Sequence, residues 1–372
     1  MIKSISPKKP TKKYRDDSES VRNAVYDGVQ EENRPIPDSI IATLRHKQFT
    51  PHPLFYNGHA QTILASAWPR FLTTSAREGN EERLFEIEPD VRLLAHCNWQ
   101  SSPIMHPTLL LVHGLEGSSS SKYMLGTADK AFAAGFNIIR LNMRNCGGTE
   151  HLTPTLYHSG MSGDLRIIAK ELIERDQLPS IFLIGFSMGG NLVLKLAGEE
   201  ANTLPEEVSG FCAVSPAIDL SSCVKAIRYR SNWVYEQMFL RSLRRRLRIK
   251  HALYPNLYDT SDLHLVRTIR DFDERYTAHH GGFADADDYY SRASALPLIE
   301  YIRRPTLIIH AQDDPFIPFE PFNHSSVNGN PHVLLLAPER GGHVGFVSGD
   351  ANELDRFWAE NRLVDFCKLV AE

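Results

Sequence analysis

Long apolar runs are missing from this chain of 372 residues, and so is any closely spaced pair of cysteines. A membrane-spanning helix needs about 18 consecutive apolar residues, so we expect no integral membrane anchor. The N-terminal segment is basic but has no apolar core, so we expect no secretory signal there. The five cysteines are odd in number, and none forms a C-x-x-C pair. We therefore expect neither a disulfide framework nor a zinc site, and a reducing, cytoplasmic location.

The chain also lacks a strong charge of either sign. Its formal net charge is −4, from 41 Lys and Arg against 45 Asp and Glu, which argues against a nucleic-acid partner. The glycine-rich signatures of dinucleotide binding and of the P-loop are absent as well. We expect no cofactor and no metal ion, which leaves a small molecule as the partner.

Strand and helix patterns alternate through most of the chain after a polar and basic start. Residues 1–50 are predicted to be an N-terminal tail and extension, partly disordered, with the disorder over residues 1–34. Alternating apolar residues on both sides of Pro89-Asp90 predict an antiparallel hairpin, Arg83–Glu88 with Val91–His96. Continuous apolar runs predict buried strands of a mostly parallel sheet at Thr108–Val112, Phe136–Leu141, Ile181–Ile184, Val208–Val214, Pro305–His310 and His332–Leu336.

Helical patterns separate these strands. They lie at Lys122–Ala134 and at residues 161–175, and a closing helix is expected from about Ala351 to Val370, with Leu354 among its core residues. Residues 51–62 contain prolines and an Asn-Gly pair, which predict irregular backbone. This alternation is typical of an α/β fold with helices on both faces of a central sheet.

Residues 217–296 interrupt the alternation with no clear buried strand, and we interpret them as a helical cap or lid insertion. The core is then formed by residues 51–216 and 297–372. The insertion contains a basic run, residues 241–248, that could be read as a phosphate or nucleic-acid site. Because Leu240, Leu243 and Leu247 form an apolar stripe at helical spacing, a solvated helix face is favoured instead.

The stretch Gly185-Phe186-Ser187-Met188-Gly189 reads G-x-S-x-G between an apolar run and a helix-forming segment. Strand, sharp turn and helix in this order form a nucleophile elbow, which exposes a serine hydroxyl at the edge of the sheet. A serine in an ordinary glycine-rich turn is the alternative. The Met188 N–H, at the start of the helix, would point toward negative charge developing on a bound carbonyl.

A serine nucleophile needs a base and an acid, which follow it in the order acid, then histidine, in this kind of fold. Asp313 and Asp314 come directly after a predicted strand. We favour Asp314 because it precedes proline, with Asp313 left as a turn or cap residue. Of the 16 histidines, His343 lies in a glycine-rich loop after the last core strand, from which it could reach back over the sheet edge. His310 lies at the end of a predicted strand, where burial is expected instead.

An oxyanion hole needs two N–H donors. Met188 supplies one, and Leu115, in the loop His113–Gly117 after an earlier strand, is placed to supply the other. A plain turn is the alternative interpretation of that loop.

At this point the sequence resembles the YheT-like esterases of the α/β-hydrolase superfamily from about residue 50 to the C-terminus. The stretches that carry the resemblance are His113–Ser118, Arg144–Gly148, Tyr157–Gly160, Gly185–Asn191, Asp313–Phe316 and Asn57–Thr62. The resemblance implies an α/β-hydrolase fold, a Ser187–Asp314–His343 charge-relay set, and hydrolysis of short-chain esters or acylglycerols. Asn145 stands where the family usually has Gly, and Asn tolerates the left-handed conformation that such a turn needs.

The sequence therefore predicts a serine hydrolase that cleaves carboxylic esters through an acyl-enzyme, with a small ester or lipid-like substrate. The segment 217–296 is expected to cover the site and to set acyl selectivity. An acyltransferase that passes the acyl group to an alcohol is the first alternative. A non-catalytic binding protein that kept the fold is the second.

Overall fold

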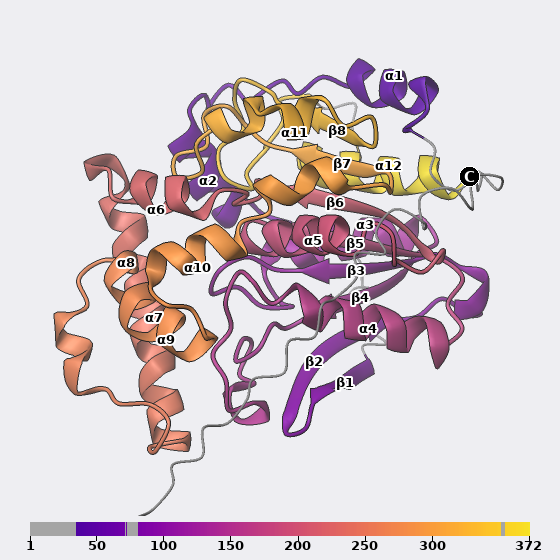
Figure 1. The fold of residues 1–372 in the computed structure, drawn as a ribbon. Helices are drawn as coiled ribbons and strands as arrows, with labels where there is room; N and C mark the ends of the chain where they lie inside the picture. The colour runs from indigo at the N-terminus through magenta and orange to yellow at the C-terminus, as the bar shows by residue number, and fades with distance from the viewer. Residues whose placement is uncertain (1–34, 71, 73–80, 351–353) are drawn as a thin grey trace, which may run out of the picture. The chain divides into compact units, whose positions relative to one another are not determined.

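One eight-stranded sheet forms the centre of the compact unit Arg34–Glu372 (Figure 1). The computed structural model describes residues 35–70, 72, 81–350 and 354–372. The predicted disorder of residues 1–34 lies outside these ranges.

The strands follow the order β1-β2-β4-β3-β5-β6-β7-β8 across the sheet. In chain order they are β1 (Glu81–Glu88), β2 (Val91–Asn98), β3 (Thr108–Val112), β4 (Asn137–Leu141), β5 (Ile181–Phe186), β6 (Val208–Val214), β7 (Thr306–Ile309) and β8 (Val333–Leu336). β1 and β2 pair as an antiparallel hairpin, and β2 joins β4 antiparallel, whereas every pair from β4 to β8 is parallel. The predicted hairpin and mostly parallel sheet are confirmed.

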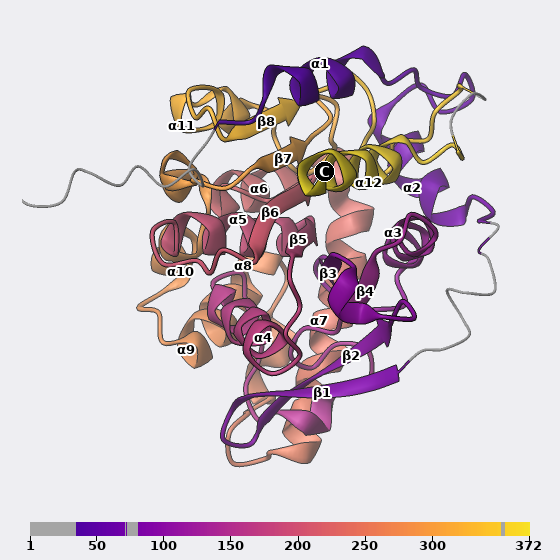
Figure 2. The same ribbon diagram turned by 90° about the vertical axis from the view of Figure 1, so that its right-hand side faces the viewer.

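Helices cover both faces of the sheet (Figure 2). On one face lie α3 (Lys122–Ala133) and α12 (Trp358–Ala371), which pack with Leu109 and Leu111 of β3. On the other lie α4 (Ser162–Glu174) and α5 (Met188–Glu199), which pack with Leu110 and Val112. Because side chains alternate along a strand, a strand that is apolar at every position is buried on both faces.

The start of the described chain contains two helices. α1 (Asp38–His46) packs on α12 with Ile40 and Leu44 buried. α2 (Gly58–Ala67) lies where the sequence predicted irregular backbone, so that prediction is wrong over this range. The Asn57 side chain accepts a hydrogen bond from the Ala60 N–H at 2.8 Å. Asn57 therefore acts as a helix N-cap and does not open a two-residue turn.

The C-terminal helix begins at Trp358, later than the sequence predicted. Phe357 forms a β-bridge with Val347, which holds its backbone out of the helical conformation. Leu354 is 79% exposed, so its predicted place in the core is wrong. The buried residues of the helix include Leu363 and Phe366.

Only helices lie between β6 and β7, and we call residues 217–296 within this stretch the cap segment (Figure 1). The helices are α6 (Leu220–Ile227), η4 (Arg230–Asn232), α7 (Trp233–Leu253), η5 (Ser261–Leu265), α8 (Ile269–Phe272), the π-helix η6 (Asp273–Thr277), α9 (Ala278–Gly281), α10 (Ala286–Ala293) and η7 (Leu296–Tyr301). Short elements elsewhere are η2 (Pro103–Met105), η3 (Glu150–Leu152), η8 (Glu320–Asn323) and α11 (Ser325–Asn328).

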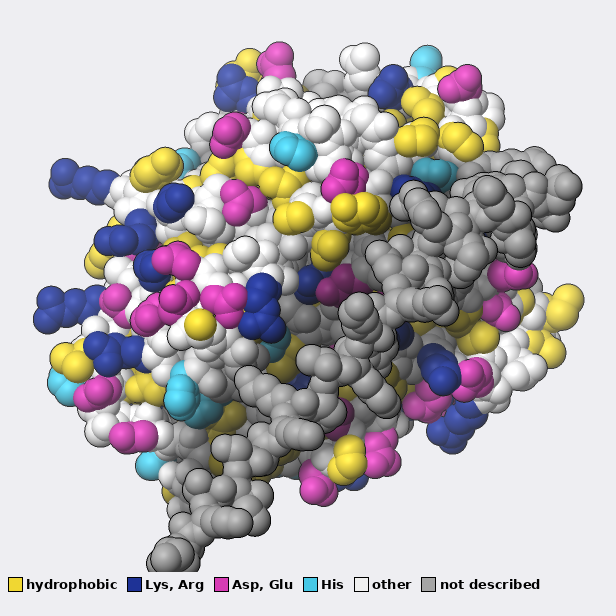
Figure 3. Space-filling view, in the orientation of Figure 1, with side chains coloured by type: hydrophobic (Ala, Val, Ile, Leu, Met, Phe, Trp, Pro, Cys, Tyr) yellow, Lys and Arg dark blue, Asp and Glu magenta, His cyan; other side chains and the backbone are white. Residues whose placement is uncertain are grey.

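Acidic and basic side chains are interspersed on the face of the molecule drawn in Figure 3. Their mixing there agrees with the small net charge of −4. None of the described helices is both long enough and apolar enough to cross a bilayer.

The turn between β5 and α5 is closely packed on both sides of Ser187. A Cβ atom on Gly185 would lie 2.1 Å from the carbonyl oxygen of Gly189. A Cβ atom on Gly189 would lie 2.5 Å from the carbonyl oxygens of Val112 and His113, at the end of β3. Both positions therefore require glycine, because backbone atoms cannot move away as a flexible side chain can.

We predict that Gly189→Ala lowers the free energy of unfolding by about 1–3 kcal/mol or more, because the new methyl group overlaps the backbone at the end of β3. Gly163→Ala is the matched control, because Gly163 lies in α4 and a Cβ atom there would have no other atom within 4 Å. Removing a glycine from a helix should raise the stability by about 0.4–1 kcal/mol. Urea unfolding of both variants measures the difference, and equal effects would contradict the packing described here.

Candidate active site

Ser187 lies in a strained turn between β5 and α5. Its φ is 55° and its ψ is −118°, outside the conformations that non-glycine residues usually adopt. The Ser187 N–H donates to the carbonyl of Val214 at the end of β6, at 2.9 Å. This hydrogen bond ties the turn to the neighbouring strand and helps to hold the strained conformation. Ser187 lies on the wall of a cavity, as a nucleophile elbow requires.

Asp314 and His343 form a hydrogen-bonded pair after β7 and β8. The Nδ1 of His343 and the Oδ2 of Asp314 are 2.8 Å apart. The Asp314 side chain is fully buried, and its Oδ1 accepts the backbone N–H groups of Phe316 and Ile317 at 3.1 and 3.0 Å. Burial alone would raise the pKa of Asp314, but the charge and hydrogen bond of His343 outweigh it, and the pKa lies below its ordinary value. The carboxylate is thus ionised and oriented at neutral pH.

Asp313 has a different partner from its neighbour. Its Oδ1 accepts the backbone N–H of Gly342 at 2.9 Å, and burial raises its pKa. Asp313 therefore holds the loop that carries His343, while Asp314 bonds to the imidazole itself. The sequence left the two aspartates as alternatives, and the hydrogen bonds separate them.

The helix α2 also holds the His343 loop. The His343 N–H donates to the Thr62 hydroxyl at 2.9 Å, and the Gln61 side chain bonds both the N–H and the carbonyl of Val347. A Cβ atom on Gly342 would lie 2.3 Å from the Gly58 carbonyl oxygen. Sequence reasoning missed these contacts, although the family resemblance included residues 57–62.

The His343 loop reaches back from β8 toward β5, across two intervening strands. The Val344 N–H donates to the hydroxyl of Ser215, at the end of β6, at 3.1 Å. The Phe316 ring packs on the imidazole of His343, with ring centroids 4.1 Å apart, and lines the same cavity as Ser187. Among the described residues no hydrogen bond joins the Ser187 hydroxyl to His343. Such bonds are often long without substrate and shorten when it binds.

The loop after β3 lies directly beside Ser187. A Cβ atom on Gly114 would be 2.9 Å from the Ser187 Cβ. The N–H groups of Gly114 and Glu116 donate to the hydroxyls of Tyr123 and Tyr157, each at 3.0 Å. Within the described residues, the backbone N–H groups of Leu115 and Met188 have no acceptor. These are the two donors that the sequence predicted for an oxyanion hole.

The same loop is bound to the cap segment through Glu116. Its carboxylate accepts two hydrogen bonds from Arg246 of α7, at 2.8 and 3.1 Å, and others from Tyr157 and Ser242. Arg246 is 8% exposed. The prediction of a solvated face for the basic run is therefore wrong at Arg246, because a core carboxylate draws the guanidinium inward. Leu240, Leu243 and Leu247 are buried as their spacing predicted.

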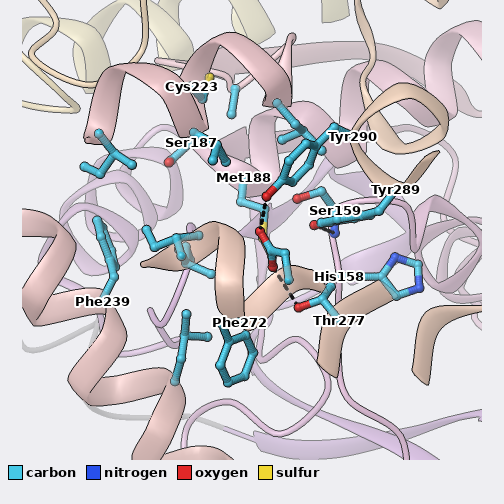
Figure 4. Close-up of a pocket in the computed structure, with 18 of the residues that line it drawn as sticks. His158, Ser159, Ser187, Met188, Cys223, Phe239, Phe272, Thr277, Tyr289 and Tyr290 are labelled. Atoms are coloured by element: carbon cyan, nitrogen blue, oxygen red, sulfur yellow. Dashed lines mark hydrogen bonds between the residues drawn. The ribbon is translucent and has the colours of Figure 1, made fainter. Parts of the chain in front are cut away.

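Most of the cavity wall is apolar (Figure 4). Ser187, Met188 and Leu115 come from the core, and the rings of Phe239 and Phe272 come from the cap segment. An apolar cavity with a few polar groups fits an ester with hydrocarbon parts. In the part of the chain that the structure describes, no three His, Cys, Asp or Glu side chains are grouped as a metal site requires.

Comparison with known proteins agrees with this geometry. A family model described as the alpha/beta hydrolase fold matches residues 107–350. The chain belongs to the α/β-hydrolase family. It is 32% identical over 330 residues to "Putative esterase YheT" of Escherichia coli, which covers 87% of this chain and 94% of that protein. The chain is therefore a member of the YheT-like esterase family, and the predicted fold class is confirmed.

Two further proteins are similar to this chain, one in sequence and one in fold alone. The monoacylglycerol lipase of Saccharomyces cerevisiae is 30% identical over 275 residues, which span 71% of this chain and 59% of the lipase. The esterase Pf2001 of Pyrococcus furiosus has a TM-score of 0.54 at 15% identity, over 87% of this chain and 98% of that one, and shows the shared fold alone. The chain is thus an α/β hydrolase of the esterase and lipase type.

We predict that Asp314→Asn lowers kcat on an ester substrate by about 10⁴-fold, because an amide no longer selects the tautomer or stabilises the charged imidazole. Asp313→Asn is the matched control. It retains an oxygen that can accept the Gly342 N–H, so kcat should stay close to that of the wild type. Steady-state kinetics on a p-nitrophenyl ester measure both, and a larger loss in Asp313→Asn would reverse the assignment.

Proposed function

We propose that the protein hydrolyses carboxylic esters with Ser187 as nucleophile, His343 as general base and Asp314 as the acid that orients it. The observation that carries the proposal is the 2.8 Å hydrogen bond between Asp314 and the Nδ1 of His343, in a loop that reaches back toward the Ser187 turn. Because Nδ1 donates to Asp314, the Nε2 of the neutral imidazole is free to accept a proton.

The first half of the reaction forms an acyl-enzyme. The Ser187 oxygen attacks the ester carbonyl carbon while Nε2 of His343 takes the hydroxyl proton. The carbonyl oxygen becomes an oxyanion, and the N–H groups of Leu115 and Met188 stabilise it. The bond to the alcohol oxygen then breaks, and His343 returns the proton to the departing alcohol.

The second half releases the acid. Water attacks the acyl carbon and gives a proton to Nε2 of His343, and a second oxyanion forms at the same two N–H groups. When the bond to Ser187 breaks, His343 returns the proton to the serine oxygen, and the enzyme is restored. This half of the reaction makes the enzyme a hydrolase, in contrast to an acyltransferase, in which an alcohol would replace water.

The substrate class that we propose is short-chain esters or acylglycerols. The apolar wall of the cavity supports hydrocarbon parts, and the Saccharomyces cerevisiae relative is named for monoacylglycerol hydrolysis. Residues 217–296 are proposed to act as a cap that sets acyl selectivity, because Phe239, Leu243 and Phe272 from this segment line the cavity.

The five cysteines are all free thiols, which supports the expected cytoplasmic location.

We expect a fluorophosphonate probe to label the wild type at Ser187 and not to label Ser187→Ala. Ser159→Ala is a matched control, because Ser159 lines the same cavity but does not lie in a strand–turn–helix elbow, and this variant should still be labelled. Mass spectrometry of the tryptic peptides identifies the modified residue. Labelling that persists in Ser187→Ala, or wild-type protein that does not react, would refute the proposed nucleophile.

A further inference from the structure

Two charged side chains of opposite sign line the cavity that contains Ser187. Arg246 is paired with Glu116 at 2.8 Å. Asp273 has no Lys, Arg or His partner at ion-pair distance among the described residues. Arg270, whose positive charge does act on Asp273, is bound to Asp287 at 2.7 Å. The cavity thus contains a carboxylate without a direct counter-ion, which a protein interior does not usually retain.

Asp273 is held in place by two neutral donors. The Thr277 hydroxyl donates to its Oδ1, and the Tyr290 hydroxyl of α10 donates to its Oδ2, both at 2.8 Å (Figure 4, dashed lines). A carboxylate oxygen can accept two hydrogen bonds, so within the described residues each oxygen retains one unused position. Asp273 and Thr277 are the two ends of the π-helix η6, a form that occurs often at functional sites.

The burial and the negative charge of the Asp273 carboxylate favour an additional hydrogen-bond donor. Burial raises the pKa of Asp273 to about 6, although the hydrogen bonds from Thr277 and Tyr290 act in the opposite direction. In its ionised form, Asp273 places a negative charge on a side chain that is only 8% exposed. A hydrogen bond to a charged, desolvated group is stronger than one between neutral groups, so a hydroxyl brought into the cavity would be bound there.

We propose that Asp273 is a substrate-binding residue that accepts a hydrogen bond from a hydroxyl group on the part of the ester that occupies the cavity. The preferred substrates are then hydroxylated esters, either of hydroxy acids or of polyols such as glycerol. This inference rests on the proposed ester hydrolysis at Ser187 and deepens it by naming a polar feature of the substrate. A purely structural role would need only the two internal hydrogen bonds. In Asp273→Asn the amide oxygen can accept one of them, and the amide NH2 can donate to the other hydroxyl, which then acts as the acceptor.

The test compares esters that differ in one hydroxyl. One arm uses p-nitrophenyl esters of straight-chain acids and of their ω-hydroxy counterparts, from butanoate to decanoate. The other arm uses butanoate esters of straight-chain alcohols and of the matching diols. The two arms separate a hydroxyl on the acyl side from one on the alcohol side. In wild-type protein we expect kcat/KM to favour the hydroxylated member by about tenfold or more in at least one arm.

Asp273→Asn should reduce this preference at least severalfold, mainly through a higher KM for the hydroxylated esters. Asp262→Asn is the matched control, because Asp262 is a cap-segment carboxylate whose side chain is 60% exposed, and it should keep the preference. If Asp273→Asn does not fold, Tyr290→Phe serves, because it leaves the carboxylate with one internal donor and should keep or increase the preference. No preference in the wild type, or an unchanged preference in Asp273→Asn, would overturn the proposal.

A binding measurement separates this proposal from the proposed reaction. In the Ser187→Ala background, a hydroxylated ester should raise the Tm more than its plain counterpart, and the difference should disappear in Ser187→Ala/Asp273→Asn. This readout needs no turnover. Failure of the reaction at Ser187 appears as an unlabelled wild type in the fluorophosphonate experiment, whereas failure of the Asp273 proposal appears as equal Tm shifts for the two esters.

Discussion

The close approach of backbone to backbone around Ser187 is the constraint on which the site depends. Ser187 has a φ of 55°, and this conformation persists because the neighbouring chain leaves no room for another. Gly189 is in contact with the end of β3, and Gly114 of the following loop is in contact with Ser187 itself. The same contacts hold the loop that contains Leu115 beside the turn that contains Ser187 and Met188. A rigid arrangement of this kind costs little reorganisation when charge develops on a substrate.

A second set of contacts holds the loop of His343, which reaches back from β8 toward β5. The loop after β8 is held at Gly342 by Asp313, at His343 by Thr62 of α2, and at Val344 by Ser215, which follows β6. None of these three groups bonds to the imidazole ring. They fix the backbone on both sides of His343. The hydrogen bond from Asp314 then sets the orientation of the imidazole ring. The ion pair between Glu116 and Arg246 connects the loop after β3 to α7 of the cap segment.

Local patterns in the sequence predicted most of the sheet, and they also selected the residues that we propose for the site. An apolar run flanked by turns, such as Thr108–Val112, predicts a buried strand. The G-x-S-x-G stretch and its neighbours predict a strand, a sharp turn and a helix. The predictions that were wrong concern residues whose conformation or burial depends on a partner far away in the sequence. The closing helix begins at Trp358 because Phe357 bridges to Val347, and Arg246 is buried because Glu116 lies across from it. Neither partner is close in sequence, so no periodicity could have shown them.

We propose that three loops place a nucleophile, a base and two N–H donors around one reacting carbon. A crystal structure of the protein after reaction with a fluorophosphonate tests this claim most directly, because the tetrahedral phosphorus adduct resembles the acyl-transfer intermediate. The account predicts phosphorus on the Ser187 oxygen and a phosphonyl oxygen within hydrogen-bond distance of the N–H groups of Leu115 and Met188. It also predicts the Nε2 of His343 close to the Ser187 oxygen. An adduct on another residue, or a phosphonyl oxygen that points away from both N–H groups, would contradict the account.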